Sequence, residues 1–114
     1  MPLAFPPHAR LRKPREFEAV LKQGRRVQEK LLSAVVLAGA GSEARLGLAI
    51  SAKSVPLATG RNRIKRLARE SFRARRATLP PADIVLQARA GAGAADSNEL
   101  RATLERLWRK VADA

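Results

Sequence analysis

The sequence predicts an α+β fold in which three helices pack against a small central sheet. Three observations carry this prediction. The hydrophobic patterns run in the order helix, strands, helix, strand, helix along the chain. The 114 residues, 46% of them hydrophobic, suffice for one packed domain but not for two. No apolar run approaches the ~20 residues that a membrane span needs. We therefore expect a flexible tail over residues 1–9 and one domain over residues 10–114.

The first half of the chain contains one helical pattern and two strand patterns. A helix is predicted to begin near Pro14, which suits a first turn, and to end at Gly24 as a C′ residue. The apolar run over residues 31–37 predicts a strand that is largely covered on both faces. A turn over residues 38–42 leads to a second, alternating strand over residues 45–51. The apolar side chains of that strand share one face: Leu46, Leu48 and Ile50.

The second half adds two helices and one strand. Residues 59–76 have a helical period that ends before Pro80–Pro81, and residues 83–89 predict a short strand. Asp96 and Glu99 have the spacing of a capping box at the start of the last helix. The predicted apolar stripes are Ile64, Leu67, Ala68, Ser71 and Phe72 in the first helix, and Leu100, Leu104, Leu107, Trp108 and Val111 in the second.

The charge of the chain indicates a polyanionic partner. There are 23 Lys and Arg residues against 10 Asp and Glu residues, and the difference, 23 − 10, is a net charge of +13. Self-repulsion of this size destabilises a fold unless a polyanion relieves it. A nucleic acid is the first expectation, and an anionic membrane surface is the weaker alternative.

Several kinds of chemistry are excluded or disfavoured by the composition. The absence of Cys excludes a disulfide framework, a Cys-based zinc site and a thiol nucleophile. The single histidine, His8, cannot form a histidine metal cluster, and the acidic residues are scattered. Glycine-rich loops of the nucleotide-binding kind are also missing. We expect no catalytic residue, no cofactor, no metal site and no small-molecule substrate.

The strongest functional signal is the basic helix over residues 61–76, which holds eight basic residues and one acidic residue. Guanidinium groups bind phosphate oxygens bidentately, so a row of them matches a nucleic-acid backbone. The alternative is a solvated face with surface ion pairs, but Glu70 can pair with at most two of the cations. Five of the cations fall within one arc of about 100° on this helix: Lys65, Arg66, Arg69, Arg73 and Arg76. Asn62 lies on the same side of the helix.

Two further patterns are compatible with binding and with plain packing. In the strand over residues 45–51, small residues alternate with the apolar ones, and Lys53 continues the face that they form. A face without bulky side chains leaves a shallow groove. The first helix could equally cover this face. Phe17 lies among N-terminal cations, where a base could stack on it for roughly 1–3 kcal/mol. A core role in the first helix is the favoured interpretation of Phe17 taken alone.

The sequence resembles the protein subunit of bacterial ribonuclease P. Arg61-Asn62-Arg63 and the residues up to 73 resemble the signature helix of that family, and residues 45–53 resemble its central strand. Residues 10–13 followed by Phe17 resemble its opening. The resemblance implies an αβββαβα two-layer sandwich of the ribosomal protein S5 domain 2-like type. It also implies a left-handed β-α-β crossover and a short extra strand near residues 26–28.

The implied function is that of an accessory subunit in a cytoplasmic endoribonuclease. A catalytic RNA, which requires magnesium, would remove the 5′ leader from precursor tRNA, while the protein binds the leader and stabilises the RNA. The alternatives are a structural RNA-binding protein of ribosomal type and a DNA-binding module that inserts the basic helix into a major groove. No helix-turn-helix pair precedes the basic helix, which disfavours the second of these.

The resemblance also assigns site residues. Those expected to contact the catalytic RNA are Arg61, Asn62, Arg63, Lys65, Arg66, Arg69 and Arg73. Those expected at the leader cleft are Arg12, Lys13, Phe17, Ser33, Val35, Arg45, Ala49, Ser51 and Lys53. The sequence departs from the family pattern at Leu21, Ala52 and Pro56-Leu57.

Overall fold

The computed structural model describes residues 9–39, 41 and 43–113. Residues 1–8 of the predicted tail, with His8, and part of the predicted turn over residues 38–42 lie outside the described residues. The elements follow the predicted order αβββαβα: α1 (Pro14–Gln23), β1 (Arg25–Gln28), β2 (Leu32–Ala38), β3 (Arg45–Ala49), α2 (Ala58–Arg75), β4 (Ala82–Ala88) and α3 (Ser97–Asp113), with short 3-10 turns at Arg76–Thr78 and Ala92–Ala94.

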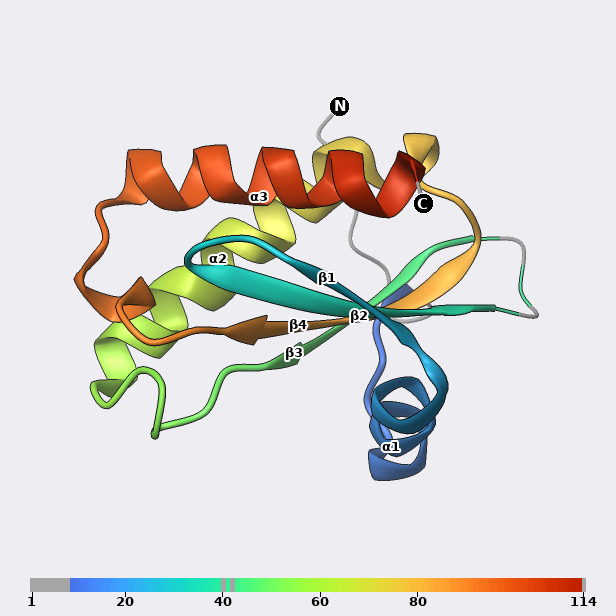
Figure 1. Cartoon of the computed structure of the whole chain (residues 1–114), viewed down its shortest axis with the longest axis horizontal. Helices are drawn as coiled ribbons and strands as arrows, with labels where there is room; N and C mark the ends of the chain where they lie inside the picture. The colour runs from blue at the N-terminus through green and yellow to red at the C-terminus, as the bar shows by residue number, and fades with distance from the viewer. Residues whose placement is uncertain (1–8, 40, 42, 114) are drawn as a thin grey trace.

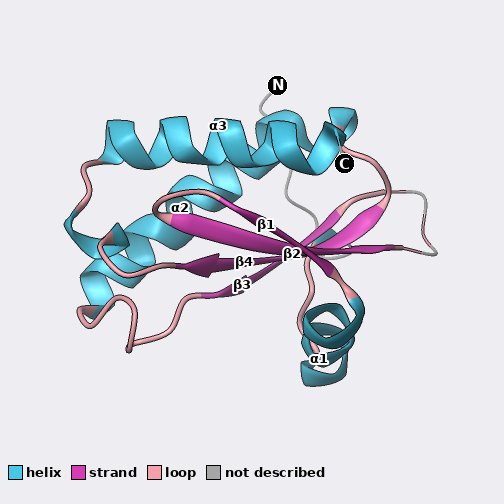
Figure 2. Ribbon diagram, in the orientation of Figure 1, coloured by secondary structure: helices cyan, strands magenta, loops and turns pink. Residues whose placement is uncertain are grey.

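The four strands form one mixed sheet in the order β1-β2-β4-β3 (Figure 2). β2 pairs antiparallel with β1 and with β4, whereas β3 and β4 are parallel. The chain passes from β3 to β4 through α2, because a parallel pair needs a long crossover connection. The extra strand that was expected near residues 26–28 is β1.

The main core lies between the sheet and a layer formed by α2 and α3, and this confirms the predicted two-layer packing (Figure 1). Both predicted apolar stripes are buried, except Ser71, which is half-buried. Ser71 accepts a hydrogen bond of 2.7 Å from the indole Nε1 of Trp108. The Trp108 ring packs against Phe72 at a centroid distance of 5.8 Å, so a polar atom in the core is satisfied while the aromatic pair joins the two helices.

A second, smaller core lies on the other face of the sheet, beneath α1 (Figure 1). Val20 of α1 and Leu11 pack there against Val35 of β2 and Val85 of β4. β2 is therefore covered on both faces, as its nearly continuous hydrophobic run predicted. No helix among the described residues combines the length and the apolar content that a membrane span requires.

Gly24 ends α1 as predicted. Its backbone is extended, with a φ of −78° and a ψ of 164°. Glycine is required here by close approach. A Cβ at this position would lie 2.5 Å from the carbonyl oxygen of Val20 and 2.6 Å from Cγ1 of Val35. The chain turns from α1 into β1 directly against β2, where no side chain fits.

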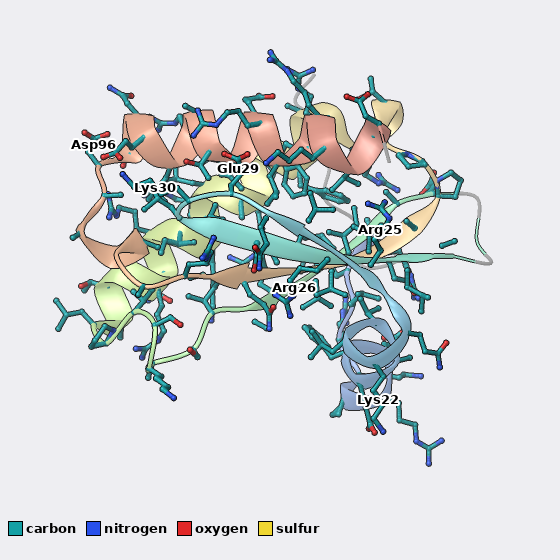
Figure 3. All side chains as sticks on the ribbon, in the orientation of Figure 1. Lys22, Arg25, Arg26, Glu29, Lys30 and Asp96 are labelled. Atoms are coloured by element: carbon teal, nitrogen blue, oxygen red, sulfur yellow. The ribbon has the colours of Figure 1, made fainter. Side chains whose placement is uncertain are left out.

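Glu29 fastens the end of β1 to α3 (Figure 3). Its carboxylate lies 2.8 Å from Nε of Arg106 and 2.5 Å from Nζ of Lys110, and its side chain is only 10% exposed. The hydrogen bond from Arg106, then that from Lys110, lowers the pKa of Glu29 below its ordinary 4.5 despite the burial that raises it. The carboxylate therefore stabilises the fold above the unfolded-state pKa, and this stabilisation is lost as the pH falls through the lower folded-state pKa.

Replacing Glu29 with glutamine should lower the free energy of unfolding at pH 7 by about 1–2 kcal/mol, because two charged hydrogen bonds are lost. The difference from the wild type should shrink as the pH falls from about 4.5, where the unfolded chain begins to take up the proton, through the lower pKa of the native carboxylate. Urea unfolding at a series of pH values measures both effects. Glu18→Gln is the matched control, since Glu18 pairs with Lys22 on an exposed helix face. Equal losses for the two variants would contradict the assigned role of Glu29.

Candidate nucleic-acid interface

The start of α1 is clamped to the sheet by Arg45 of β3. Its Nε and Nη2 donate to the two carboxylate oxygens of Asp83 at 2.8 Å, and its Nη1 donates to Oε2 of Glu16 at 2.9 Å. The hydrogen bonds to Asp83 raise the pKa of Arg45 more than burial lowers it. Arg45 was predicted to line the leader cleft, but its guanidinium binds Asp83 and Glu16 of the protein itself. We therefore describe Arg45 as a positioning residue for α1.

Glu16 completes this clamp from the helix side. Its Oε1 accepts from the backbone N–H of Lys13 at 3.2 Å and of Arg12 at 3.4 Å. Burial raises the pKa of Glu16, but these hydrogen bonds and the one from Arg45 outweigh it, so the net pKa is lowered. The side chains of Arg12 and Lys13 remain exposed at the start of α1.

α1 places Phe17 directly over Gly47 of β3. A Cβ at Gly47 would lie 2.7 Å from Cζ and 2.8 Å from Cε1 of the Phe17 ring, and 3.0 Å from Cβ of Leu11. Phe17 packs against the smaller core while remaining half-buried. The core interpretation of Phe17 is therefore confirmed in part, whereas stacking of a base on its half-buried ring stays a prediction.

Replacing Gly47 with alanine should displace the Phe17 ring and lower the free energy of unfolding by about 1–3 kcal/mol through overpacking. A smaller side chain at position 17 should relieve the clash. We therefore expect Phe17→Leu and Gly47→Ala to be less destabilising together than the sum of the single changes. Urea unfolding of the two single variants and the double variant measures this coupling. Strictly additive effects would show that the ring does not rest on Gly47.

The other predicted cleft residues divide into a covered and an exposed group. Ser33 is 3% and Val35 is 2% exposed, so both are covered by the protein itself. Lys53 and Ser51 are exposed beyond the end of β3, and Ala49 is half-buried. The face of the sheet that α1 leaves open is thus narrower than the nine assigned positions imply.

Two polar residues on this open face were missed by the sequence analysis. Nη1 of Arg26 donates to Oγ of Ser33 at 3.4 Å and to Oε1 of Gln87 at 3.2 Å. Gln87 lies in register with Ser33 on one side and with Ala49 on the other. Figure 3 shows Arg26 on the side of the sheet that points away from α3. The strand period could have placed Gln87, since it alternates with the core residues of β4.

The cations of α2 also fall into two groups. Arg61 donates to the carbonyl oxygens of Val55 at 2.8 Å and Pro56 at 2.9 Å. Arg63 donates to the carbonyl oxygens of Ala95 at 2.6 Å and Gly93 at 3.2 Å, and to Oγ of Ser97 at 3.4 Å. These two signature arginines therefore hold the loops on either side of the start of α2.

Of the remaining predicted residues of α2, Asn62, Arg66 and Arg69 are exposed, whereas Lys65 and Arg73 are half-buried and the Nε of Arg73 is buried. Among the described residues, none supplies a carboxylate or a hydrogen-bond acceptor to the side chains of Lys65, Arg66, Arg69 and Arg73. Arg76 belongs to the predicted arc as well, but it forms an ion pair with Glu43. Arg75, on the flank, pairs with Glu105 of α3 at 2.7 Å.

The cations near α3 and those of α2 and the start of α1 differ in whether an acidic residue neutralises them. On the α3 side, Arg106 and Lys110 are neutralised by Glu29, and Arg89 donates to the carbonyl oxygen of the same residue. By contrast, the outward row of α2 and the side chains of Arg12 and Lys13 have no anionic partner among the described residues. These faces are suited to a polyanion, because their mutual repulsion is relieved only by an external ligand.

Comparison with known proteins decides the family. The family model described as Ribonuclease P matches residues 5–112. The chain belongs to the ribonuclease P protein family. It is 42% identical over 108 residues to the ribonuclease P protein component of Cronobacter sakazakii, covering 95% of this chain and 91% of that protein. It is 39% identical over 107 residues to that of Thioalkalivibrio sulfidiphilus, covering 94% and 89%.

Solved structures of ribonuclease P proteins share the fold. The protein from Staphylococcus aureus matches with a TM-score of 0.85 and 27% identity, over 91% of this chain and 97% of that chain. The protein from Thermotoga maritima matches with a TM-score of 0.79 and 29% identity, over 90% and 96%. The family resemblance and the α+β fold predicted from the sequence are thus confirmed. As a ribonuclease P protein component, the chain belongs to an endoribonuclease.

Proposed function

We propose that this chain acts in the cytoplasm as the protein subunit of a ribonuclease P holoenzyme that removes the 5′ leader from precursor tRNA. The observation that supports this proposal most directly is the row of unpaired cations on α2: Lys65, Arg66, Arg69 and Arg73. A rigid helix that docks on the core and carries such a row on its outer side, with Arg66 and Arg69 exposed, is suited to a phosphate backbone. In the proposed complex this row binds the catalytic RNA.

The open face of the sheet is the proposed binding site for the leader. Phe17 offers an accessible ring on which a base can stack. Arg26, Gln87 and Lys53 extend the same face with polar and cationic side chains. A single strand fits this arrangement because its bases are free to stack and to form hydrogen bonds, unlike those of a duplex.

We assign the chemistry of cleavage to the RNA and to the magnesium ions that the RNA would hold. In the parts of the chain that the structure describes, no three His, Cys, Asp or Glu side chains gather as a metal site requires. The protein would contribute phosphate neutralisation, which stabilises a folded RNA, and a hold on the leader, which favours the precursor over the product.

Reconstitution tests this proposal. We expect the full chain to raise the rate of precursor-tRNA cleavage by the catalytic RNA at low magnesium, and to make the holoenzyme bind leader-bearing precursor more tightly than mature tRNA. The control is the catalytic RNA with an equal positive charge of polylysine. Binding of the RNA without any stimulation of cleavage would instead favour a structural RNA-binding protein of ribosomal type. Preferential binding of duplex DNA in a gel-shift comparison would favour a DNA-binding module.

A further inference from the structure

A groove of about 300 Å³ runs along the free edge of β3, between the segment before α1 and the outer face of α2. It adjoins the open face of the sheet at Phe17 but extends away from it, because Lys65 and Arg69 of α2 form its other wall. Arg12 and Phe17 belong to the opposite wall. The groove therefore joins the two groups of cations, at the start of α1 and on α2, into one continuous surface.

The floor and the rim of this groove differ in chemistry. The apolar residues of its lining form the floor: Leu11, Phe17, Leu46 and Leu48. The rim is cationic: Arg10, Arg12, Lys65 and Arg69. Among the described residues, none neutralises Arg12, Lys65 or Arg69. A ligand that fits must combine a flat, largely apolar body with negative charge, and this combination is that of a nucleotide rather than of a peptide or a lipid chain.

The backbone of β3 adds hydrogen-bonding groups to the floor. The N–H of Leu11 donates to the carbonyl oxygen of Leu46 at 3.0 Å, so the peptide groups of Leu46 point away from β4. Peptide direction alternates along a strand, and the groups of Leu48 therefore point the same way. β3 is an edge strand, and its outer bridge to the described chain joins Arg10 with Leu46. The donor and the acceptor of Leu48 are thus left for a ligand.

We propose that this groove takes a single unstacked nucleotide of the catalytic RNA, with the base on Leu48 at the free edge of β3 and the flanking phosphates on the cationic rim. The inference deepens the proposed function and rests on it. The volume lies at the lower end of small-ligand sites, which suits one nucleotide and excludes a duplex. An inserted base, together with the phosphate contacts of α2, would fix the register of the protein on the RNA.

The first test blocks the groove without removing charge. We expect Leu48→Trp to weaken binding of the catalytic RNA roughly tenfold, because the stacked base is lost. The slope of log Kd against log salt should stay unchanged, since no phosphate contact is removed. Ala102→Trp, which adds the same side chain on the exposed face of α3, should bind like the wild type. Circular dichroism establishes whether each variant is folded.

The second test needs no variant and decides the case if Leu48→Trp fails to fold. The full chain is titrated with adenosine 5′-monophosphate and with ribose 5-phosphate, and backbone amide shifts are followed by NMR. We expect the nucleotide to shift Leu46, Leu48 and Arg69 more strongly than ribose 5-phosphate, which lacks the base. Equal shifts with both ligands, or a folded Leu48→Trp that binds RNA like the wild type, would overturn the groove proposal alone. Failure of the wild type to bind the RNA would overturn the proposed function itself.

Discussion

Replacing Arg66 and Arg69 together with alanine should weaken binding of the catalytic RNA by about 2–3 kcal/mol, or roughly 30- to 160-fold. Both side chains lie exposed on α2, and no described residue neutralises them. In the proposed complex each would bind a phosphate, so the slope of log Kd against log salt should fall in magnitude by roughly 1.5. The free energy of unfolding without RNA should stay the same or rise, because two mutually repelling charges are removed. Filter binding across a salt series and urea unfolding measure the two quantities.

The matched control separates a local contact from a general effect of charge. Arg101→Ala with Arg109→Ala removes the same net charge from the exposed face of α3. Arg101 has only a weak hydrogen bond of 3.4 Å to Asn98, so the fold should tolerate its loss. We expect this pair of changes to reduce RNA affinity far less. Equal losses for the α2 pair and the α3 pair would mean that the RNA responds to net charge and not to the row on α2.

The order of elements could be predicted because each pattern is local. The helical stripe around Phe72 and Trp108 and the nearly continuous apolar run of β2 are set by spacing within a few residues. These patterns determine which faces enter the core, and the structure buries them accordingly. The exposed cations of α2 were predicted for the same reason, since they lie opposite the apolar stripe of their own helix.

Contacts that join distant parts of the chain could not be predicted. Arg63 donates to carbonyl oxygens some 30 residues away, and Arg45 meets Asp83 across the parallel pair of strands. A basic residue that binds RNA and one that supports a loop look alike in a sequence. Gly24 shows the same limit. A side chain is excluded at this position because Val35 of a neighbouring strand lies too close, and not because of the φ of Gly24.

The signature helix therefore combines two tasks that its sequence does not distinguish. The outward row presents charge to the proposed RNA partner. Arg61 instead holds the loop after β3, and Arg63 the loop after β4, against the start of α2. An arginine suits this second task because its guanidinium donates in several directions at once, which a lysine cannot reproduce.

Replacing Arg63 with alanine should lower the free energy of unfolding by about 2–3 kcal/mol, because the carbonyl groups of Gly93 and Ala95 lose a shared charged donor. Arg63→Lys keeps the charge but not the fork of donors, so it should recover little of this loss. Urea unfolding of both variants gives the values. Arg66→Ala on the next turn is the matched control and should change stability by at most about 0.5 kcal/mol.

RNA binding by the same variants then tests whether the two tasks are truly separate. Measured under conditions where Arg63→Ala remains folded, its salt slope should equal that of the wild type, whereas Arg66→Ala should lower the slope. A reduced slope with unchanged stability for Arg63→Ala would mean that its guanidinium leaves Gly93 and Ala95 to bind a phosphate. Wild-type stability of Arg63→Lys would show that charge alone, and not the directional hydrogen bonds, holds the loop over residues 91–97 against α2.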